Sequence, residues 1–456
     1  MKWIKILGVL ACSLLIGATA ACAEQTPEWS LKEREDISDV WNGVSVGFAF
    51  LARPDAVYIG FYSYDQTMTV GRRPFDSDRW EFKKLPTKIG WDSHNSIAMA
   101  FDANDCLHVA GNMHACPLIY FRASKPNDVS SLERVEHMIG DSEARCTYPT
   151  FTYNKEKRLI FTYRFGVSGN GVQIWNAYDE KTRSWSRMLD KPLFDGRNLM
   201  NAYFVGPTLG PDGYFHVAWV WRDTPDAATN HDLSYARSVD LVRWEKSNGE
   251  PCELPITIES GEIVDPVPAK CGILNSHVRM AFDQKGRVVL TYTKYDANGR
   301  LQIWNARLEE NGWNLVQATD WDFEWNFSGG GSLPNEFELG GVRPSSADTL
   351  VVPWKQVRAN KSGSTYLSLD TLKPCPAPKQ TGSIERPEYS PEDAALINAI
   401  ESDDSRLLKR ARALDVNGER WIFRWEAPDA NRDRAQPDGA PQPTKIRVFK
   451  FIRNDE

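Results

Sequence analysis

The stretch HNSIAMAFDANDCLHVAGNMH, residues 94–114, has the pattern of a β-hairpin that begins and ends on a histidine. An apolar run ends at Phe101, the polar turn 102–105 follows, and a second apolar run begins at Leu107. The stretch TYPTFTYNKEKRLIFTYR, residues 147–164, repeats this design. Short apolar runs separated by polar turns are typical of antiparallel β-sheets. The sequence therefore predicts an all-β fold.

The same unit recurs along most of the chain. Further polar turns lie at 211–213, 283–286 and 415–418, and several units end in a tryptophan, namely Trp80, Trp185, Trp244 and Trp313. Repeats of this kind are typical of propeller blades. About 430 residues at about 60 per unit give about seven blades. We expect residues 24–456 to form one seven-bladed β-propeller domain, closed by pairing of 46–50 with 445–451.

Two segments depart from this repeat. Ser390 and the acidic residues after it have the pattern of a helix start, with the helix running towards Ile400. Residues 424–444 are rich in Pro, Asp and Ala, which predicts a long surface loop within the last blade.

The N-terminus has the composition of a secretory signal. Lys2 and Lys5 flank an apolar run that ends at Leu15, and small residues lead to Ala23. We expect residues 1–23 to be a signal peptide and the protein to be secreted or periplasmic. Lipid anchoring at Cys22 is the alternative, although the residues before it lack the usual aliphatic side chain. No other segment is long enough for a membrane span.

The charge and composition of the chain limit the classes of molecule that it is expected to bind. The formal net charge is −7, and loss of the two signal-peptide lysines makes it −9. An acidic chain is a poor binder of nucleic acid, whose recognition depends on phosphate neutralisation. A local cationic cleft can still bind an acidic polysaccharide. We expect a monomer, and the pairing of its six remaining cysteines stays open.

Polar residues recur at one end of four successive predicted hairpins. Residues opposite each other in an antiparallel pair share a face and lie about 5 Å apart. Counting outwards from each turn predicts four such pairs, namely His94 with His114, Tyr148 with Arg164, Asn201 with Arg222, and Asn275 with Lys294. Hairpin ends converge on the channel of a propeller. The pairs therefore predict one cationic cleft suited to proton abstraction beside a carboxylate.

The histidines and cysteines of the sequence also have simpler interpretations. A lone histidine is usually structural, and we assign His108 that role, but two histidines at matched positions favour a site. Two further histidines and two cysteines, His231, Cys252, Cys271 and His277, are a donor set suited to structural zinc. Their spacing is irregular, so a Cys252–Cys271 disulfide or unrelated residues are the alternatives.

These residues resemble a known family. The segments 94–96, 112–114, 147–151, 163–171, 201–203 and 229–238 are similar to the BNR-repeat polysaccharide lyases, most of all to the seven-bladed ulvan lyases. The resemblance covers most of 40–375 and is weaker beyond about 320. It implies β-elimination at a uronic acid of a sulfated, rhamnose-rich polymer, leaving a 4,5-unsaturated uronate.

The resemblance also implies roles for the residues. Arg164 would pair with the uronate carboxylate, and His94 or Tyr148 would be the base. Tyr148 would protonate the leaving oxygen, and His114 would assist. Substrate contacts at Asn201, Arg222, Asn275 and Lys294 are predicted from the hairpin counting alone. The resemblance also implies a structural zinc at His231, Cys252, Cys271 and His277. No organic cofactor is expected.

Two other functions compete. A glycoside hydrolase on the same fold, such as a rhamnosidase, would lack the lyase histidines, and both are present here. A non-catalytic carbohydrate-binding propeller would repeat one aromatic pocket in every blade. The polar pairs here differ from blade to blade, which favours a single asymmetric site.

Overall fold

The structure is a computed structural model that describes residues 29–378, 407–437, 439 and 442–453. Within these residues the strands form seven separate sheets, whose strand pairs are all antiparallel. In the described residues, helix is confined to three short 3-10 turns, η1 (Val129–Ser131), η2 (Ala227–Thr229) and η3 (Asn275–His277). The all-β prediction is confirmed. The predicted signal peptide and the predicted helix towards Ile400 lie outside the described residues.

After β1, three sheets follow in chain order. The first contains four strands that are consecutive in the sequence, β2 (Ala49–Arg53), β3 (Ala56–Tyr62), β4 (Thr67–Pro74) and β5 (Glu81–Lys88). The next contains β6 (Ala98–Phe101), β7 (Leu107–Ala110), β9 (Tyr120–Ala123) and β10 (Leu132–Arg134). The third contains β8 (His114–Cys116), β11 (Cys146–Tyr153), β12 (Leu159–Val167), β13 (Asn170–Asp179) and β14 (Ser184–Arg187). Strand β8 thus leaves its neighbours in sequence and joins the following sheet.

Three further sheets follow the same plan. One is formed by β15 (Asn201–Leu209), β16 (Phe215–Arg222), β17 (Asn230–Ser238), β18 (Trp244–Glu245), β19 (Pro251–Cys252) and β20 (Glu262–Asp265). The next is formed by β21 (Arg279–Phe282), β22 (Val288–Tyr295), β23 (Leu301–Glu309) and β24 (Gly312–Gln317). The third is formed by β25 (Phe337–Leu339), β26 (Arg343–Ser346), β27 (Thr349–Gln356) and β28 (Lys361–Ser368). The polar turns predicted at 211–213 and 283–286 connect β15 to β16 and β21 to β22, as expected.

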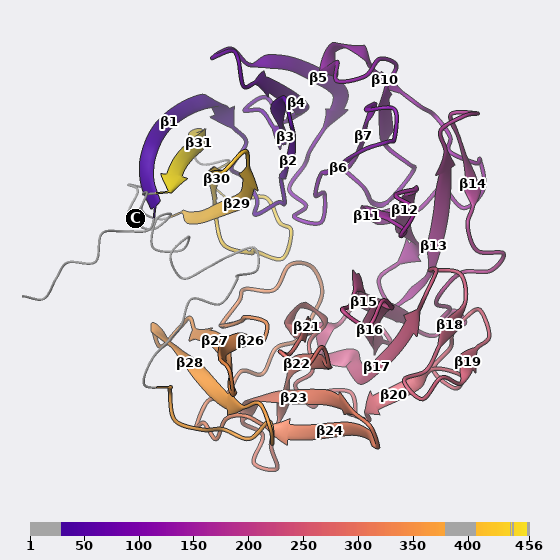
Figure 1. The fold of residues 1–456 in the computed structure, drawn as a ribbon, viewed down its shortest axis with the longest axis vertical. Helices are drawn as coiled ribbons and strands as arrows, with labels where there is room; N and C mark the ends of the chain where they lie inside the picture. The colour runs from indigo at the N-terminus through magenta and orange to yellow at the C-terminus, as the bar shows by residue number, and fades with distance from the viewer. Residues whose placement is uncertain (1–28, 379–406, 438, 440–441, 454–456) are drawn as a thin grey trace, which may run out of the picture.

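The last sheet joins both ends of the described chain. Its order is β1 (Trp29–Val40), β31 (Thr444–Arg453), β30 (Glu419–Ala427) and β29 (Leu408–Val416). Figure 1 shows this sheet beside β2–β5, so that the sheets follow one another around a common centre. The long loop predicted at 424–444 is shorter, because β30 continues to Ala427.

The predicted closing strand was wrong. The chain closes through β1, which pairs with β31 along its length, whereas 46–50 leads into β2 and pairs with β3. Strand β1 is rich in charged residues and was not recognised as a strand. Its Asp36 accepts a bond from Arg447 at 2.7 Å, one of several such pairs along the ladder. The segment 46–50 packs on the same sheet by side chains, with the Phe48 and Trp425 rings 4.8 Å apart.

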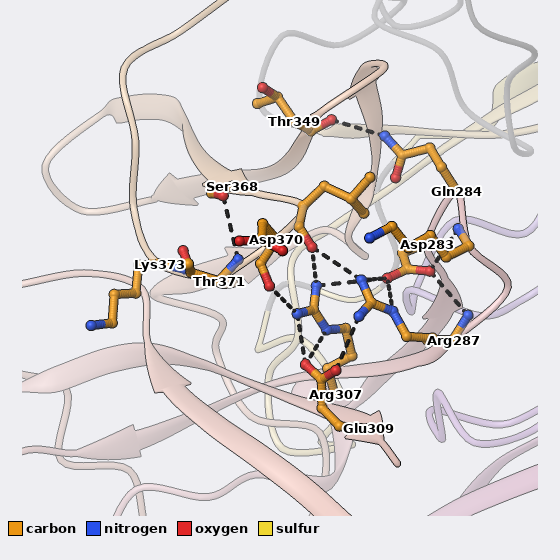
Figure 2. Close-up of polar contacts among 12 residues, drawn as sticks. Asp283, Gln284, Arg287, Arg307, Glu309, Thr349, Ser368, Asp370, Thr371 and Lys373 are labelled. Atoms are coloured by element: carbon orange, nitrogen blue, oxygen red, sulfur yellow. Dashed lines mark hydrogen bonds and ion pairs between the residues drawn. The ribbon is translucent and has the colours of Figure 1, made fainter. Parts of the chain in front are cut away.

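A buried ionic network joins two neighbouring sheets (Figure 2). Arg307 on β23 is fully buried and bonds to Glu309 at 2.7 Å. It also donates to the backbone oxygens of Leu369 and Asp370, which follow β28, at 2.5 and 2.7 Å. Arg307 therefore links β23 to the end of the next sheet.

Candidate active site

One aspartate holds both predicted histidines. Oδ1 of Asp92 accepts a hydrogen bond from Nδ1 of His94 at 2.7 Å, and Oδ2 accepts one from Nδ1 of His114 at 2.5 Å. The two imidazole rings stack with their centroids 4.2 Å apart. Asp92 therefore fixes the tautomer of each ring, and Nε2 is the nitrogen left to exchange a proton.

The two histidines come together by a different route from the predicted hairpin. The β6–β7 ladder begins at Ala98, so His94 lies in the loop before it rather than on a strand. His114 lies on β8 and pairs with Thr147 of the next sheet. Asn112 and Ala115 adopt left-handed conformations, with φ of 58° and 52°, which turn β8 away from β7. The proximity was predicted, but the predicted register was wrong.

A second carboxylate reaches His94 from the far end of the chain. Asp433 lies in the loop between β30 and β31, and its Oδ2 is 3.3 Å from Nδ1 of His94. Its Oδ1 accepts bonds from the backbone nitrogen and hydroxyl of Ser93 at 3.1 and 2.7 Å. Nothing in the sequence indicated this contact.

These carboxylates set the charge of His94. Burial lowers the pKa of His94, but the hydrogen bonds to Asp433 and Asp92 outweigh it and raise the pKa to about 9. Burial opposes ionisation of Asp92, yet the bonds from His114 and His94 hold its pKa well below the usual range. The pKa of Asp433 is lowered in the same way by His94 and Ser93, against its burial. The cluster therefore holds an imidazolium between two carboxylates at neutral pH.

Tyr148 and Arg164 lie beside the histidines. The ladder pairs Arg164 with Thr147, and an irregularity between Thr147 and Thr150 displaces Tyr148, whose φ is 56°. The predicted direct pairing was therefore one residue off. The two side chains still meet, because the Arg164 guanidinium lies 5.0 Å from the centroid of the Tyr148 ring. The Tyr148 ring is also 5.9 Å from the His94 ring, so Tyr148 lies close to both the imidazole and the guanidinium.

Arg164 is a buried cation held without a carboxylate. It is 2% exposed and donates to Oγ1 of Thr147 at 3.1 Å and to the Tyr203 hydroxyl at 3.2 Å. Among the described residues no carboxylate lies within ion-pair distance of it, and its Nε has no hydrogen-bond partner. An unpaired buried cation is costly unless a ligand supplies the opposite charge. Arg164 is therefore suited to bind an anion.

Tyr148 remains protonated at neutral pH. Its side chain is 39% exposed, but loss of water around the phenol and the neighbouring Tyr203 raise its pKa. Arg164 and Arg222 act in the opposite direction without reversing the shift. A phenol in this state can donate a proton.

The predicted pair Asn201 and Arg222 is confirmed as opposite partners on β15 and β16. The Arg222 guanidinium lies 5.3 Å from the Tyr203 ring centroid. Nδ2 of Asn201 is buried and has no partner among the described residues. These groups extend the largely buried polar cluster that includes Arg164.

The predicted pair Asn275 and Lys294 is not formed. The β21–β22 ladder ends where Arg279 faces Thr291, and Asn275 lies before it in η3. Asn275 accepts a bond from Asn230 at 3.3 Å, whereas Lys294 bonds to Asp265 at 2.6 Å. Because Lys294 is already neutralised, it adds little positive charge to the cleft.

The four predicted zinc ligands are not brought together. His277 is buried against Thr293 Oγ1 and the Phe337 carbonyl, and His231 bonds to Asp223 and Asp232. Cys252 and Cys271 pack against different hydrophobic clusters. Throughout the described parts of the chain, the one group of three or more potential ligands within 4.8 Å of each other is Asp92, His94 and His114. The predicted donor set therefore does not fit a zinc ion.

Sequence reasoning missed three residues of the site, Asp92, Tyr203 and Asp433. Asp92 lies two residues before His94, and Tyr203 lies two residues after Asn201 on the same face of its strand. Both positions could have been inferred from spacing. Asp433 gave no local signal.

Comparisons with known proteins support the fold. A polysaccharide lyase, Uly1, has a crystal structure that superposes with a TM-score of 0.59 at 14% identity, covering 93% of this chain and all of that one. An ulvan lyase of family PL25, solved bound to -[GlcA(1-4)Rha3S]-, superposes with a TM-score of 0.56 at 11% identity and covers 87% and 93%. No helix in the described parts of the chain has the length and apolar character needed to cross a membrane.

At the sequence level, the long isoform of ulvan lyase from Glaciecola sp. (strain KUL10) is 27% identical over 180 residues of alignment. This alignment covers 31% of the chain and spans only 18% of the relative's length. Residues 56–321, more than half of the chain, match the family described as "BNR repeat-containing family member". The chain therefore belongs to the BNR repeat-containing family.

Proposed function

We propose that this protein is an exported polysaccharide lyase that cleaves a uronate-containing polymer by β-elimination. The observation that carries the proposal is the histidine pair bridged by Asp92, next to Tyr148 and the unpaired, buried Arg164. We further propose that the seven sheets are the blades of a propeller and that residues 1–23 direct export.

In this mechanism Arg164 binds the uronate carboxylate. Removal of the proton at C5 places negative charge on that carboxylate, and the guanidinium stabilises it. Arg164 is held in place by Thr147 and Tyr203, so it need not reorganise during the reaction. Its lack of a carboxylate partner in the described part of the chain leaves its charge for the substrate.

His94 is proposed as the base and Tyr148 as the acid. Nδ1 of His94 is bound to Asp92, so the neutral ring accepts the C5 proton at Nε2. The raised pKa makes it a strong base, most effective where pH approaches that value. Tyr148, protonated because its pKa is raised, donates its proton to the oxygen leaving C4. The C4–O bond breaks, and a C4–C5 double bond forms.

The substrate class is proposed from the same groups and from the family relatives. Arg222 and Arg164 place two largely buried positive charges beside Tyr203, which suits an acidic substrate group. The relatives include an ulvan lyase and a lyase bound to a glucuronate–sulfated rhamnose unit. We therefore propose an ulvan-like polysaccharide as the substrate of a monomeric enzyme.

Hydrolysis is less well supported by the site. Most glycosidases need one carboxyl group that is protonated and a second that is ionised. The two carboxylates beside His94 are both held ionised by their hydrogen bonds. Incubation with ulvan and other uronate polymers distinguishes the reactions, because elimination creates an ultraviolet-absorbing unsaturated uronate. Release of reducing sugar without that absorbance would refute the lyase proposal.

A further inference from the structure

The loop between β30 and β31 is fixed against a second loop that precedes β25. The guanidinium of Arg432 donates to the backbone oxygens of Ser328 and Gly330 at 2.6 and 3.2 Å. The backbone nitrogen of Arg432 donates to Ser332 at 2.9 Å. Arg432 and Asp433 both have positive φ, 66° and 58°, which is uncommon for residues other than glycine. Strained backbone of this kind persists where surrounding contacts enforce it.

The strained turn delivers the Asp433 carboxylate to three partners on two other loops. Oδ1 accepts hydrogen bonds from the backbone nitrogen and the hydroxyl of Ser93, and Oδ2 accepts one from the backbone nitrogen of Ser332 at 2.9 Å. Oδ2 also lies 3.3 Å from Nδ1 of His94. The Asp433 side chain is 12% exposed, so these contacts are largely shielded from water. A carboxylate that only capped a loop would not need to face a catalytic imidazole.

We propose that Asp433 is a positioning residue of the site, which holds the His94 imidazole through Nδ1 and connects the closing sheet to the catalytic cluster. This proposal rests on the proposed function, since it assigns Asp433 a part in the same reaction. It implies that the site is completed only when the last sheet has closed. The β30–β31 loop would then contribute to catalysis as well as to the fold.

The titratable groups that face His94 come from four elements. Asp92 lies on its own loop, His114 on β8, Tyr148 on β11, and Asp433 on the β30–β31 loop. Removing the charge of Asp433 leaves Asp92 as the one carboxylate of this set. A neighbouring carboxylate raises the pKa of a histidine by about one unit or more. The midpoint of His94 should therefore fall by about one pH unit in Asp433→Asn.

The test is an NMR titration of the His94 ring in the full-length protein, assigned with His94→Gln. Asp429→Asn is the matched control, because Asp429 lies in the same loop and its carboxylate is bonded to its neighbour Ala430. We expect a lower midpoint in Asp433→Asn, an unchanged one in Asp429→Asn, and recovery in Asp433→Glu. If Asp433→Asn does not fold, Asp433→Ser is titrated instead. An unchanged midpoint in the folded variant would overturn the proposal.

Kinetics provide a second measurement. If Asp433 positions His94, the rising limb of kcat/KM against pH moves down by about the same unit in Asp433→Asn. A purely structural role would lower the rate equally at all pH values, and that result would also overturn the proposal. The titration needs no substrate. A wild type inactive on every polymer therefore refutes the lyase function without deciding the role of Asp433.

Discussion

Replacing Asp92 with asparagine is the most informative perturbation of the cluster. The Asp92 carboxylate accepts from Nδ1 of His94, from Nδ1 of His114 and from the backbone nitrogen of His94, at 2.7, 2.5 and 2.9 Å. An amide has one accepting oxygen and no charge, so it cannot satisfy both rings as donors. Asp92→Asn keeps the volume of the side chain but removes the bridge.

The expected effect of Asp92→Asn on the rate follows from the way the carboxylates stabilise the charged form of His94. Its pKa of about 9, against 6.5 for the free residue, corresponds to about 3 kcal/mol of added stabilisation of the imidazolium. Asp92 supplies part of this, together with Asp433. Loss of a positioned general base typically costs about 100- to 10,000-fold in rate. We expect kcat/KM of Asp92→Asn to fall at least about 100-fold at the optimum pH, with little change in KM, because Arg164 still binds the carboxylate.

The pH profile gives the direction of the effect. The neutral form of His94 is the reactive base, so the rate of the wild type should rise with pH until it passes the pKa of about 9. In Asp92→Asn that pKa falls, and the rising limb should move to lower pH.

Steady-state kinetics from pH 6 to 10 on ulvan provide the assay for Asp92→Asn. Asp322→Asn is the control, since that side chain is 84% exposed and pairs with Arg300. A wild-type profile in Asp92→Asn, or an equal loss in Asp322→Asn, would refute the reasoning.

Three further substitutions test separate parts of the account. Arg164→Lys cannot keep the hydrogen bonds to both Thr147 and Tyr203, so we expect kcat/KM to fall about 100-fold in steady-state assays. Near-normal kinetics would contradict the role assigned to Arg164. Arg307→Leu removes a fully buried guanidinium and its hydrogen bonds to the Leu369 and Asp370 carbonyls, while Arg287 still pairs with Glu309. It should lower the free energy of unfolding in chemical denaturation by about 2 kcal/mol, against about 1 kcal/mol or less for the exposed Arg243→Leu. Equal effects would show that the network does not hold the sheets. Lys294→Met leaves Asp265 without its cationic partner, so it should lower the free energy of unfolding by about 3 kcal/mol and leave KM unchanged. A raised KM would instead support the predicted contact of Lys294 with the substrate.

Local patterns in the sequence were enough to predict the strands and much of the cluster. Apolar runs separated by a polar turn identified hairpins such as β15 and β16. Strand β1 escaped recognition because it has no continuous apolar face: its charged side chains are partly exposed, and it pairs with β31, more than 400 residues away. Long-range ion pairs leave no periodic pattern in the sequence.

The site, like the strands, was predicted only where local patterns in the sequence indicate it. Hairpin counting predicted that His94 lies near His114 and Tyr148 near Arg164, although the register differs in both pairs. It failed for Asn275 and Lys294, because Asn275 lies in η3 before the ladder and Lys294 bonds to Asp265. It could not reach Asp433, which enters from a loop of the closing sheet. The exact positions of His114 and Tyr148 depend on left-handed residues that interrupt the strands.

The measurement that tests the central claim most directly is the ultraviolet absorbance of ulvan incubated with wild type, His94→Ala and Tyr148→Phe. The account predicts a rise in absorbance with the wild type and the loss of at least about 100-fold of that rate in each variant. Circular dichroism of each variant would verify that the fold is intact. A wild-type rate in His94→Ala, with the fold intact, would contradict the assignment of His94 as the base and of its cluster as the active site.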